Sequence, residues 1–145
     1  MAERTELTII NYLIETCRDA ERGFLIAAEH VRNPEMRRLF YRLAEQRRQF
    51  AEDLLPHAHR LGGAADTDGT FVATAHRTWM QLRARLVSNP DRAVLAETVR
   101  GEHYAQAAYD EAVQQMLPPD ARELVEAQDL GVRVARQLVA GLTAH

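Results

Sequence analysis

Hydrophobic residues recur every three or four positions along most of the chain, the spacing that places them on one face of an α-helix. The pattern predicts four helices of more than twenty residues and one shorter helix, at about 4–31, 35–61, 71–87, 91–117 and 121–142, with the shorter one in the middle. No segment shows the alternation of apolar and polar residues that is typical of a strand. The sequence therefore predicts an all-α protein.

Tight turns join the first two long helices and the last two. Segments 32–34 and 118–120 each contain proline, which disfavours helix at the residue before it and is tolerated at the start of the next helix. Gly62 and Gly63 have the character of a helix C-cap. The connection from Gly62 to Pro90 is long enough to run the length of a bundle and includes the shorter helix. Two antiparallel hairpins joined by a long crossover make the ferritin-like four-helix bundle, and we expect residues 1–145 to form one such domain.

Two of the long helices carry a carboxylate in the middle of an otherwise apolar stripe. The stripe of the first long helix is Ile10, Ile14, Cys17, Glu21, Phe24, Ala28 and Val31. The stripe of the third long helix is Leu95, Thr98, Glu102, Ala105, Tyr109, Ala112 and Met116. If the crossover returns the chain to the end where the first helix turns, Glu21 and Glu102 lie at one level of the core. Two buried carboxylates need a shared proton, a metal or arginine partners.

One interpretation of these carboxylates is a pair of buried ion pairs. Arg47 shares the apolar face of the second helix, and Arg133 and Arg136 lie at the matching level of the last helix. Any of the three could neutralise a core glutamate. On the last helix we expect an inward face of Leu124, Gln128, Gly131, Ala135, Leu138 and Leu142. Helix-interior glycine costs about 1 kcal/mol relative to alanine, so Gly23, Gly101 and Gly131 are expected to mark close helix approach.

The alternative interpretation is a carboxylate-bridged site for two iron or manganese ions. Such a site takes one glutamate from each of two helices and a Glu-x-x-His motif from each of the other two. The sequence supplies Glu21 and Glu102 but contains no Glu-x-x-His. Asp53 and His57, four residues apart on the second helix, are the substitutes it offers. The metal set predicted on this interpretation is Glu21, Glu102, Asp53 and His57. A degenerate pocket for a small molecule is the third alternative.

Composition narrows the classes of function. The net charge is −3, and the 18 basic residues, all arginine, are interspersed with acidic ones, so we expect no nucleic-acid partner. No apolar run approaches the ~20 residues of a membrane helix, and no signal peptide precedes the first helix. We therefore expect a cytoplasmic protein without a membrane partner. The single cysteine, Cys17, lies on an apolar stripe and is expected to be a buried, inert thiol.

Several segments of the chain resemble a bacterial ferritin-like family whose domain has no assigned function. They are LIETCRDAERGF (13–24), LGG (61–63), HRTWMQLR (76–83), RGEHYA (100–105) and LPPDARELVEAQ (117–128). The resemblance implies a ferritin-like bundle, a soluble bacterial protein and a homodimer. It implies no activity, although ferritin-like proteins more broadly store or oxidise iron or reduce peroxides at a di-metal site.

The sequence departs from that family at positions that bear on metal binding. His103 stands in place of an acidic residue, Val99 in place of a glutamate, and Arg136 in place of a histidine. The family glutamates at 15, 21, 97 and 102 are retained. We therefore expect a binding or structural module linked to stress tolerance, without a complete di-metal site and with an unidentified small-molecule or protein partner. The alternative is a di-iron or di-manganese oxidase or peroxidase, or an iron-binding protein.

Overall fold

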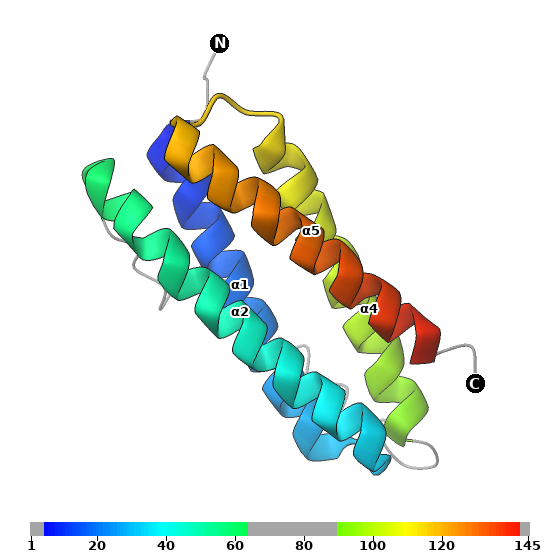
Figure 1. Cartoon of the computed structure of the whole chain (residues 1–145). Helices are drawn as coiled ribbons and strands as arrows, with labels where there is room; N and C mark the ends of the chain where they lie inside the picture. Colours follow the sequence, from blue (N-terminus) through cyan, green and yellow to red (C-terminus); the bar gives the residue numbers. More distant parts are fainter. Residues whose placement is uncertain (1–4, 64–89, 143–145) are drawn as a thin grey trace.

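Four long helices make up the computed structural model, which describes residues 5–63 and 90–142 (Figure 1). They are α1 (Glu6–His30), α2 (Pro34–Arg60), α4 (Pro90–Val113) and α5 (Pro119–Leu142). The described residues contain no strand, as the sequence predicts. The shorter helix expected at 71–87 lies outside the described residues.

Local capping explains where the first hairpin begins and ends. The hydroxyl of Thr5 accepts the Thr8 N–H at the start of α1, and the Asn33 side chain accepts two backbone N–H groups at the start of α2. Gly62 closes α2 in the left-handed conformation, with φ of 103°, and Gly63 N–H reaches back to the carbonyl of Ala58. The expected glycine C-cap is therefore confirmed.

The third long helix ends four residues earlier than predicted. Backbone bonds from Gln114 to Glu111 and from Gln115 to Ala112 tighten the chain into a turn, and Pro118 disfavours helix just before it. As a result Met116, which the periodicity placed on the inner stripe, is almost fully exposed.

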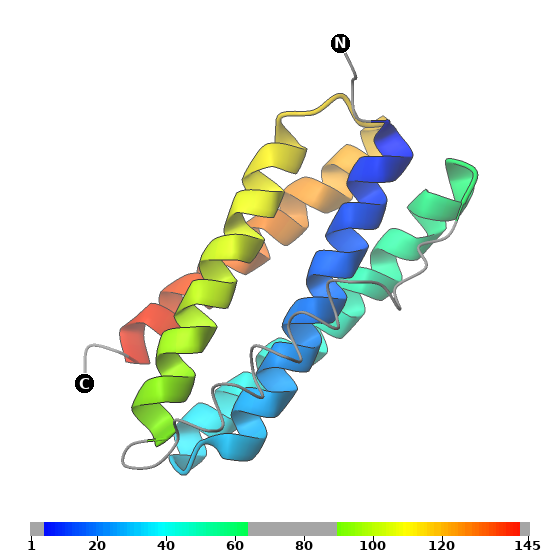
Figure 2. The same ribbon diagram turned by 180° about the vertical axis from the view of Figure 1, so that it is seen from behind.

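The helix hairpins are arranged as the long-crossover topology requires. The carboxylate of Asp91, at the start of α4, accepts the backbone N–H groups of Arg32 and Asn33 in the α1–α2 turn. The start of α4 therefore lies at the end of the bundle opposite to the end of α2, and α2 and α4 run parallel (Figures 1 and 2). Helix α1 packs on α2 and α4, and α5 packs mainly on α4. This is the ferritin-like four-helix bundle.

Apolar side chains fill the bundle in two clusters, one toward each end. The cluster near the N-terminus of α1 includes Ile10, Leu13 and Tyr109, and the cluster near the α1–α2 turn includes Phe24 and Phe40. The buried polar residues lie between these clusters and along the α4–α5 contact. They are therefore the groups in the described chain that could carry chemistry.

Candidate functional site

An ion pair between α2 and α4 occupies the core. Arg47 donates from Nη1 and Nη2 to the two carboxylate oxygens of Glu102, over 2.8 and 2.6 Å, and each residue is only 1% exposed. Arg47 also donates from Nε to the Gln46 side chain, and its guanidinium lies 5.4 Å from the ring centroid of Phe24 on α1. We call Arg47 and Glu102 the core ion pair.

The opposite charges of Arg47 and Glu102 neutralise each other in the core. Burial alone would lower the pKa of Arg47, but the charge and hydrogen bonds of Glu102 raise it above its ordinary value. The guanidinium therefore stays charged at any pH at which the protein folds. A parallel, two-pronged pair of this kind satisfies both carboxylate oxygens at once, which is the arrangement that makes burial of the two charges tolerable.

A chain of hydrogen bonds beside the core ion pair joins all four helices. Tyr109 on α4 donates its hydroxyl to Gln128 Oε1 on α5 over 2.6 Å, so the Cys17 thiol on α1, 3.1 Å away, is the donor to the Tyr109 oxygen. Gln128 in turn donates to the backbone carbonyl of Phe50 on α2. Burial raises the pKa of Cys17 to about 11 and that of Tyr109 well above its ordinary value. Both groups therefore stay protonated, which agrees with the inert thiol expected from the sequence.

A second polar network binds α4 to α5 nearer the surface. Gln106 donates to Asp110 and Asp129, and Arg133 donates to the same two carboxylates over 2.9 and 3.1 Å. Arg133 was one of the three expected partners of a core glutamate. It pairs with these aspartates at the edge of the bundle instead, because the Glu102 carboxylate is already occupied by Arg47.

The remaining predicted site residues do not gather around Glu102. Arg136 is exposed, and so is Asp53, which accepts a hydrogen bond from Gln49 on its own helix. His57 is half-buried near the end of α2, where Arg60 contacts its ring. Glu21 is half-buried at the edge of the α1 stripe rather than central in the core. The guanidinium of Arg47 neutralises only one carboxylate, that of Glu102. The carboxylate of Glu21 therefore costs less free energy where it stays partly solvated.

The described residues do not bring together the donor set of a centre of two metal ions. Both oxygens of Glu102 are engaged by a permanent cation, and no three histidine, cysteine, aspartate or glutamate side chains of residues 5–63 and 90–142 gather closely enough to hold a metal.

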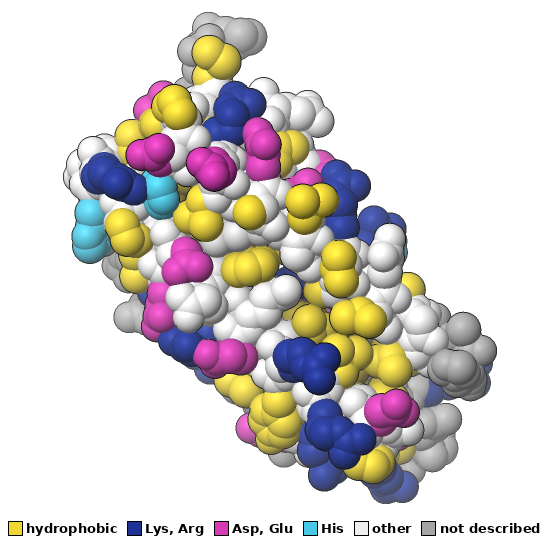
Figure 3. Space-filling view, in the orientation of Figure 1, with side chains coloured by type: hydrophobic (Ala, Val, Ile, Leu, Met, Phe, Trp, Pro, Cys, Tyr) yellow, Lys and Arg dark blue, Asp and Glu magenta, His cyan; other side chains and the backbone are white. Residues whose placement is uncertain are grey.

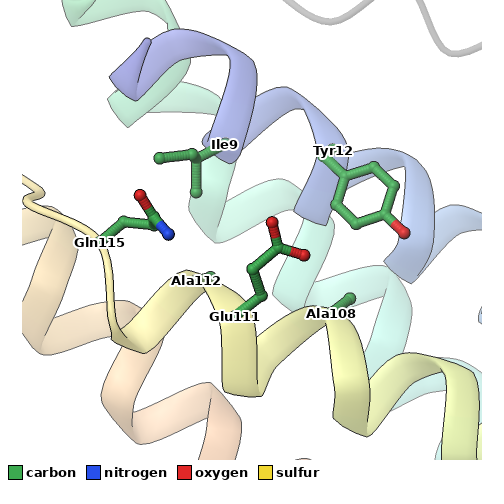
Figure 4. A pocket seen from close by; sticks show the side chains of 6 residues that line it. All are labelled: Ile9, Tyr12, Ala108, Glu111, Ala112 and Gln115. Atoms are coloured by element: carbon green, nitrogen blue, oxygen red, sulfur yellow. The ribbon is translucent and has the colours of Figure 1, made fainter. Parts of the chain in front are cut away.

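A hollow between α1 and α4 lies away from this centre. It measures about 190 Å³, part of it open to solvent, and is lined by Ile9, Tyr12, Ala108, Glu111, Ala112 and Gln115 (Figure 4). Because that volume includes open solvent, the enclosed space is far below the ~300 Å³ or more of a typical ligand site. The hollow contains neither member of the core ion pair.

Sequence reasoning anticipated the core ion pair better than the rest of this centre. Arg47 and Glu102 were each placed on the apolar stripe of their helix, and the structure joins them. The Tyr109–Gln128 bond was missed, although both residues were placed on inner faces. A glutamine and a tyrosine on inward stripes of neighbouring helices are the signal that could have predicted it, since buried polar groups require partners.

The fold and its core define a ferritin-like bundle whose central carboxylate is held by arginine. The chain belongs to the family with the domain of unknown function DUF2383, whose sequence model matches residues 5–115. Among solved structures the chain is similar to a Dps1 mutant of Mycobacterium smegmatis, with a TM-score of 0.76 and 14% identity over 94% of this chain and 93% of that one. That likeness concerns the fold alone. A comparison with curated proteins finds no match. None of the four described helices has the length and apolar character that crossing a membrane requires.

Proposed function

We propose that this protein is a binding or structural module: a ferritin-like bundle in which Arg47, rather than a pair of metal ions, neutralises the core carboxylate. The observation that carries the proposal is the two-pronged bond of Arg47 to Glu102, with both residues 1% exposed. Arginine cannot be deprotonated in a protein, so the pair holds its charge balance without a cofactor.

The surroundings of Arg47 support this proposal. A divalent ion would have to displace the guanidinium from Glu102 and leave it buried against Phe24 without its counter-charge. An uncompensated buried charge costs several kcal/mol. Metal binding at Glu102 therefore has to overcome a penalty that an open carboxylate site does not impose.

The alternative is a di-iron or di-manganese oxidase or peroxidase, or an iron-binding protein, that uses Glu21, Glu102, Asp53 and His57. It requires Asp53 and His57 to leave the outer part of α2 and Arg47 to swing out of the core. We therefore rank it second and make it an outcome of the test below.

We further propose that the module acts in the cytoplasm of a bacterium as a homodimer and contributes to stress tolerance. The support is the family resemblance, together with a free, buried thiol that needs no oxidising compartment. The proposal predicts poorer survival of a strain lacking the gene after a peroxide or acid challenge, restored by the wild-type gene. Equal survival of the two strains would remove the stress role and leave the core proposal standing.

Thermal unfolding with added metal tests the core proposal. A ligand that binds only the folded chain, at a hundred times its Kd, stabilises it by about 2.7 kcal/mol, which raises the melting temperature. We expect anaerobic Fe(II) or Mn(II) to leave the melting temperature of the wild type unchanged. A rise that disappears in Glu102→Gln but persists in Glu52→Gln, a change at an exposed carboxylate, would favour the oxidase alternative.

A further inference from the structure

Helix α5 has a second apolar face that the bundle does not use. Its inner face buries Val125, Val132 and Val139, whereas Leu130, Val134 and Leu138 are 64%, 55% and 47% exposed. The last three are four residues apart, so they form one stripe along the outside of the helix. We call Leu130, Val134 and Leu138 the outer stripe.

The outer stripe lies on an open face of the molecule. Figure 3, drawn in the orientation of Figure 1, shows hydrophobic side chains gathered along the face where α5 runs. Isolated exposed hydrophobic residues are ordinary on a protein surface, but three on one helical stripe are typical of a helix that packs against a partner. The family sequence model ends at residue 115, so it does not include this face.

The charges on α5 are divided between its two halves. The first half carries four acidic residues and one basic residue, which are Asp120, Glu123, Glu126, Asp129 and Arg122. The second half carries Arg133 and Arg136 and no acidic residue. Two copies of α5 packed in antiparallel orientation would place each acidic half against the basic half of the other copy. An isologous pair of this kind is self-complementary, because the same surface is used by both chains.

The charged residues beside the outer stripe also set a register. Glu126 and Arg133 are seven residues, or two turns, apart and lie on the same flank of the stripe. A two-fold axis near Leu130 brings Glu126 opposite the partner's Arg133 and the small Ala127 opposite the partner's Val134. Arg133 is already held in place by Asp110 and Asp129 while about half of its side chain stays exposed, at 52%. Glu126 is itself 57% exposed, and Arg122 lies 3.9 Å from its carboxylate, at the outer limit of an ion pair.

We propose that α5 docks in antiparallel orientation on α5 of a second copy of this chain, with the two-fold axis near Leu130. This inference rests on the proposed homodimer and assigns its interface. The helix is roughly 36 Å long and presents a face about 10 Å wide, or about 360 Å² per chain, against the ~800 Å² that each partner of a stable interface buries. An interface of this size is weak, so we expect the dimer to be in equilibrium with the monomer.

Sedimentation equilibrium of the full chain at increasing concentration tests the interface. We expect the wild-type mass to rise from one chain toward two, and Leu130→Glu to remain a monomer, because two new carboxylates would face each other at the axis. The matched control is Leu25→Glu, an exposed leucine on α1, which packs on α2 and α4; it should dimerise like the wild type. Circular dichroism checks that both variants fold.

The register of the two helices is tested by introducing one surface cysteine at a time and adding a short bis-maleimide cross-linker. In the antiparallel pair Leu130→Cys should cross-link between copies, whereas the Leu138→Cys positions lie roughly 24 Å apart along the helix axis and should not. The wild type, whose Cys17 is buried, is the control.

The possible results distinguish the proposed α5 interface from the proposed homodimer and from the proposal about the core ion pair. Cross-linking at both positions would overturn the antiparallel register. A wild type that stays monomeric would overturn both the interface and the homodimer. A dimer unaffected by Leu130→Glu would overturn the interface alone. None of these outcomes bears on the metal test of the core.

Discussion

Replacing Arg47 by methionine removes the cation of the core ion pair and leaves Glu102 buried at 1% exposure. With the two charges about 4 Å apart and an effective dielectric constant of about 20, their attraction is about 4 kcal/mol. Breaking one side of a buried pair typically costs about 3–5 kcal/mol. We therefore expect Arg47→Met to lower the free energy of unfolding by that amount, a large part of the ~5–15 kcal/mol available to a domain.

Urea unfolding followed by circular dichroism measures this loss. The comparison set is Arg47→Met, Glu102→Leu and the double variant, which replaces both charges by apolar side chains. We expect each single variant to lose several kcal/mol and the double variant to lose much less than their sum, since no charge is then left unpaired. A loss below about 1 kcal/mol in Arg47→Met, or additive losses in the double variant, would refute the reasoning.

Four further substitutions test other parts of the bundle by urea unfolding. Gly101→Ala should stabilise the fold by about 0.5–1 kcal/mol, because a Cβ at that position meets no atom within 4 Å. Gly131→Ala should not stabilise the fold, because its Cβ would lie 2.8 Å from an aromatic ring of α2. Equal effects of the two substitutions would contradict this packing. Tyr109→Phe should cost about 1–3 kcal/mol because it leaves the buried Gln128 oxygen without its donor, and a neutral change would show that the bond is dispensable. Burial raises the pKa of Asp19 to about 6, so its charged carboxylate destabilises the fold as pH rises. Asp19→Asn should therefore increase the free energy of unfolding at pH 8, and this gain should disappear near pH 4. A gain that does not depend on pH would refute this assignment.

The helices and their turns could be predicted because their signals are local. The spacing that predicts four long helices, the proline turn at 32–34 and the Gly62 C-cap each depend on a few neighbouring residues, and these features are confirmed. The direction of the crossover is not local, since it depends on which end of the bundle receives Asp91. The structure supplies that information through the bonds of Asp91 to the first turn.

The inner face of α5 was predicted only in part: Gln128 and Ala135 are buried as expected, but other positions differ for a physical reason. The periodicity placed Gly131 and Leu138 inward, but Leu138 is 47% exposed and the buried face carries Val125, Val132 and Val139. Both faces of the helix are apolar, so the spacing alone cannot choose between them. Gly131 lies at the edge of the inner face, where it does mark the expected close approach, whereas Gly101 lies in open space.

The candidate site was predicted only in part, because a helical pattern gives the face of a residue and not its partner. Glu102 and Arg47 share the core, but the same reasoning allowed Arg133 and Arg136 as partners. Whether a long side chain reaches the core or the surface depends on packing, here on Phe24 covering the guanidinium of Arg47.

The metal content of the purified protein tests the central claim most directly. The chain would be prepared without chelators, incubated anaerobically with Fe(II) or Mn(II), desalted and measured by elemental mass spectrometry. We predict no stoichiometric metal in the wild type, because Arg47 already holds both oxygens of Glu102. Two metal ions per chain, lost in Glu102→Gln, would contradict the account and establish a di-metal centre in its place.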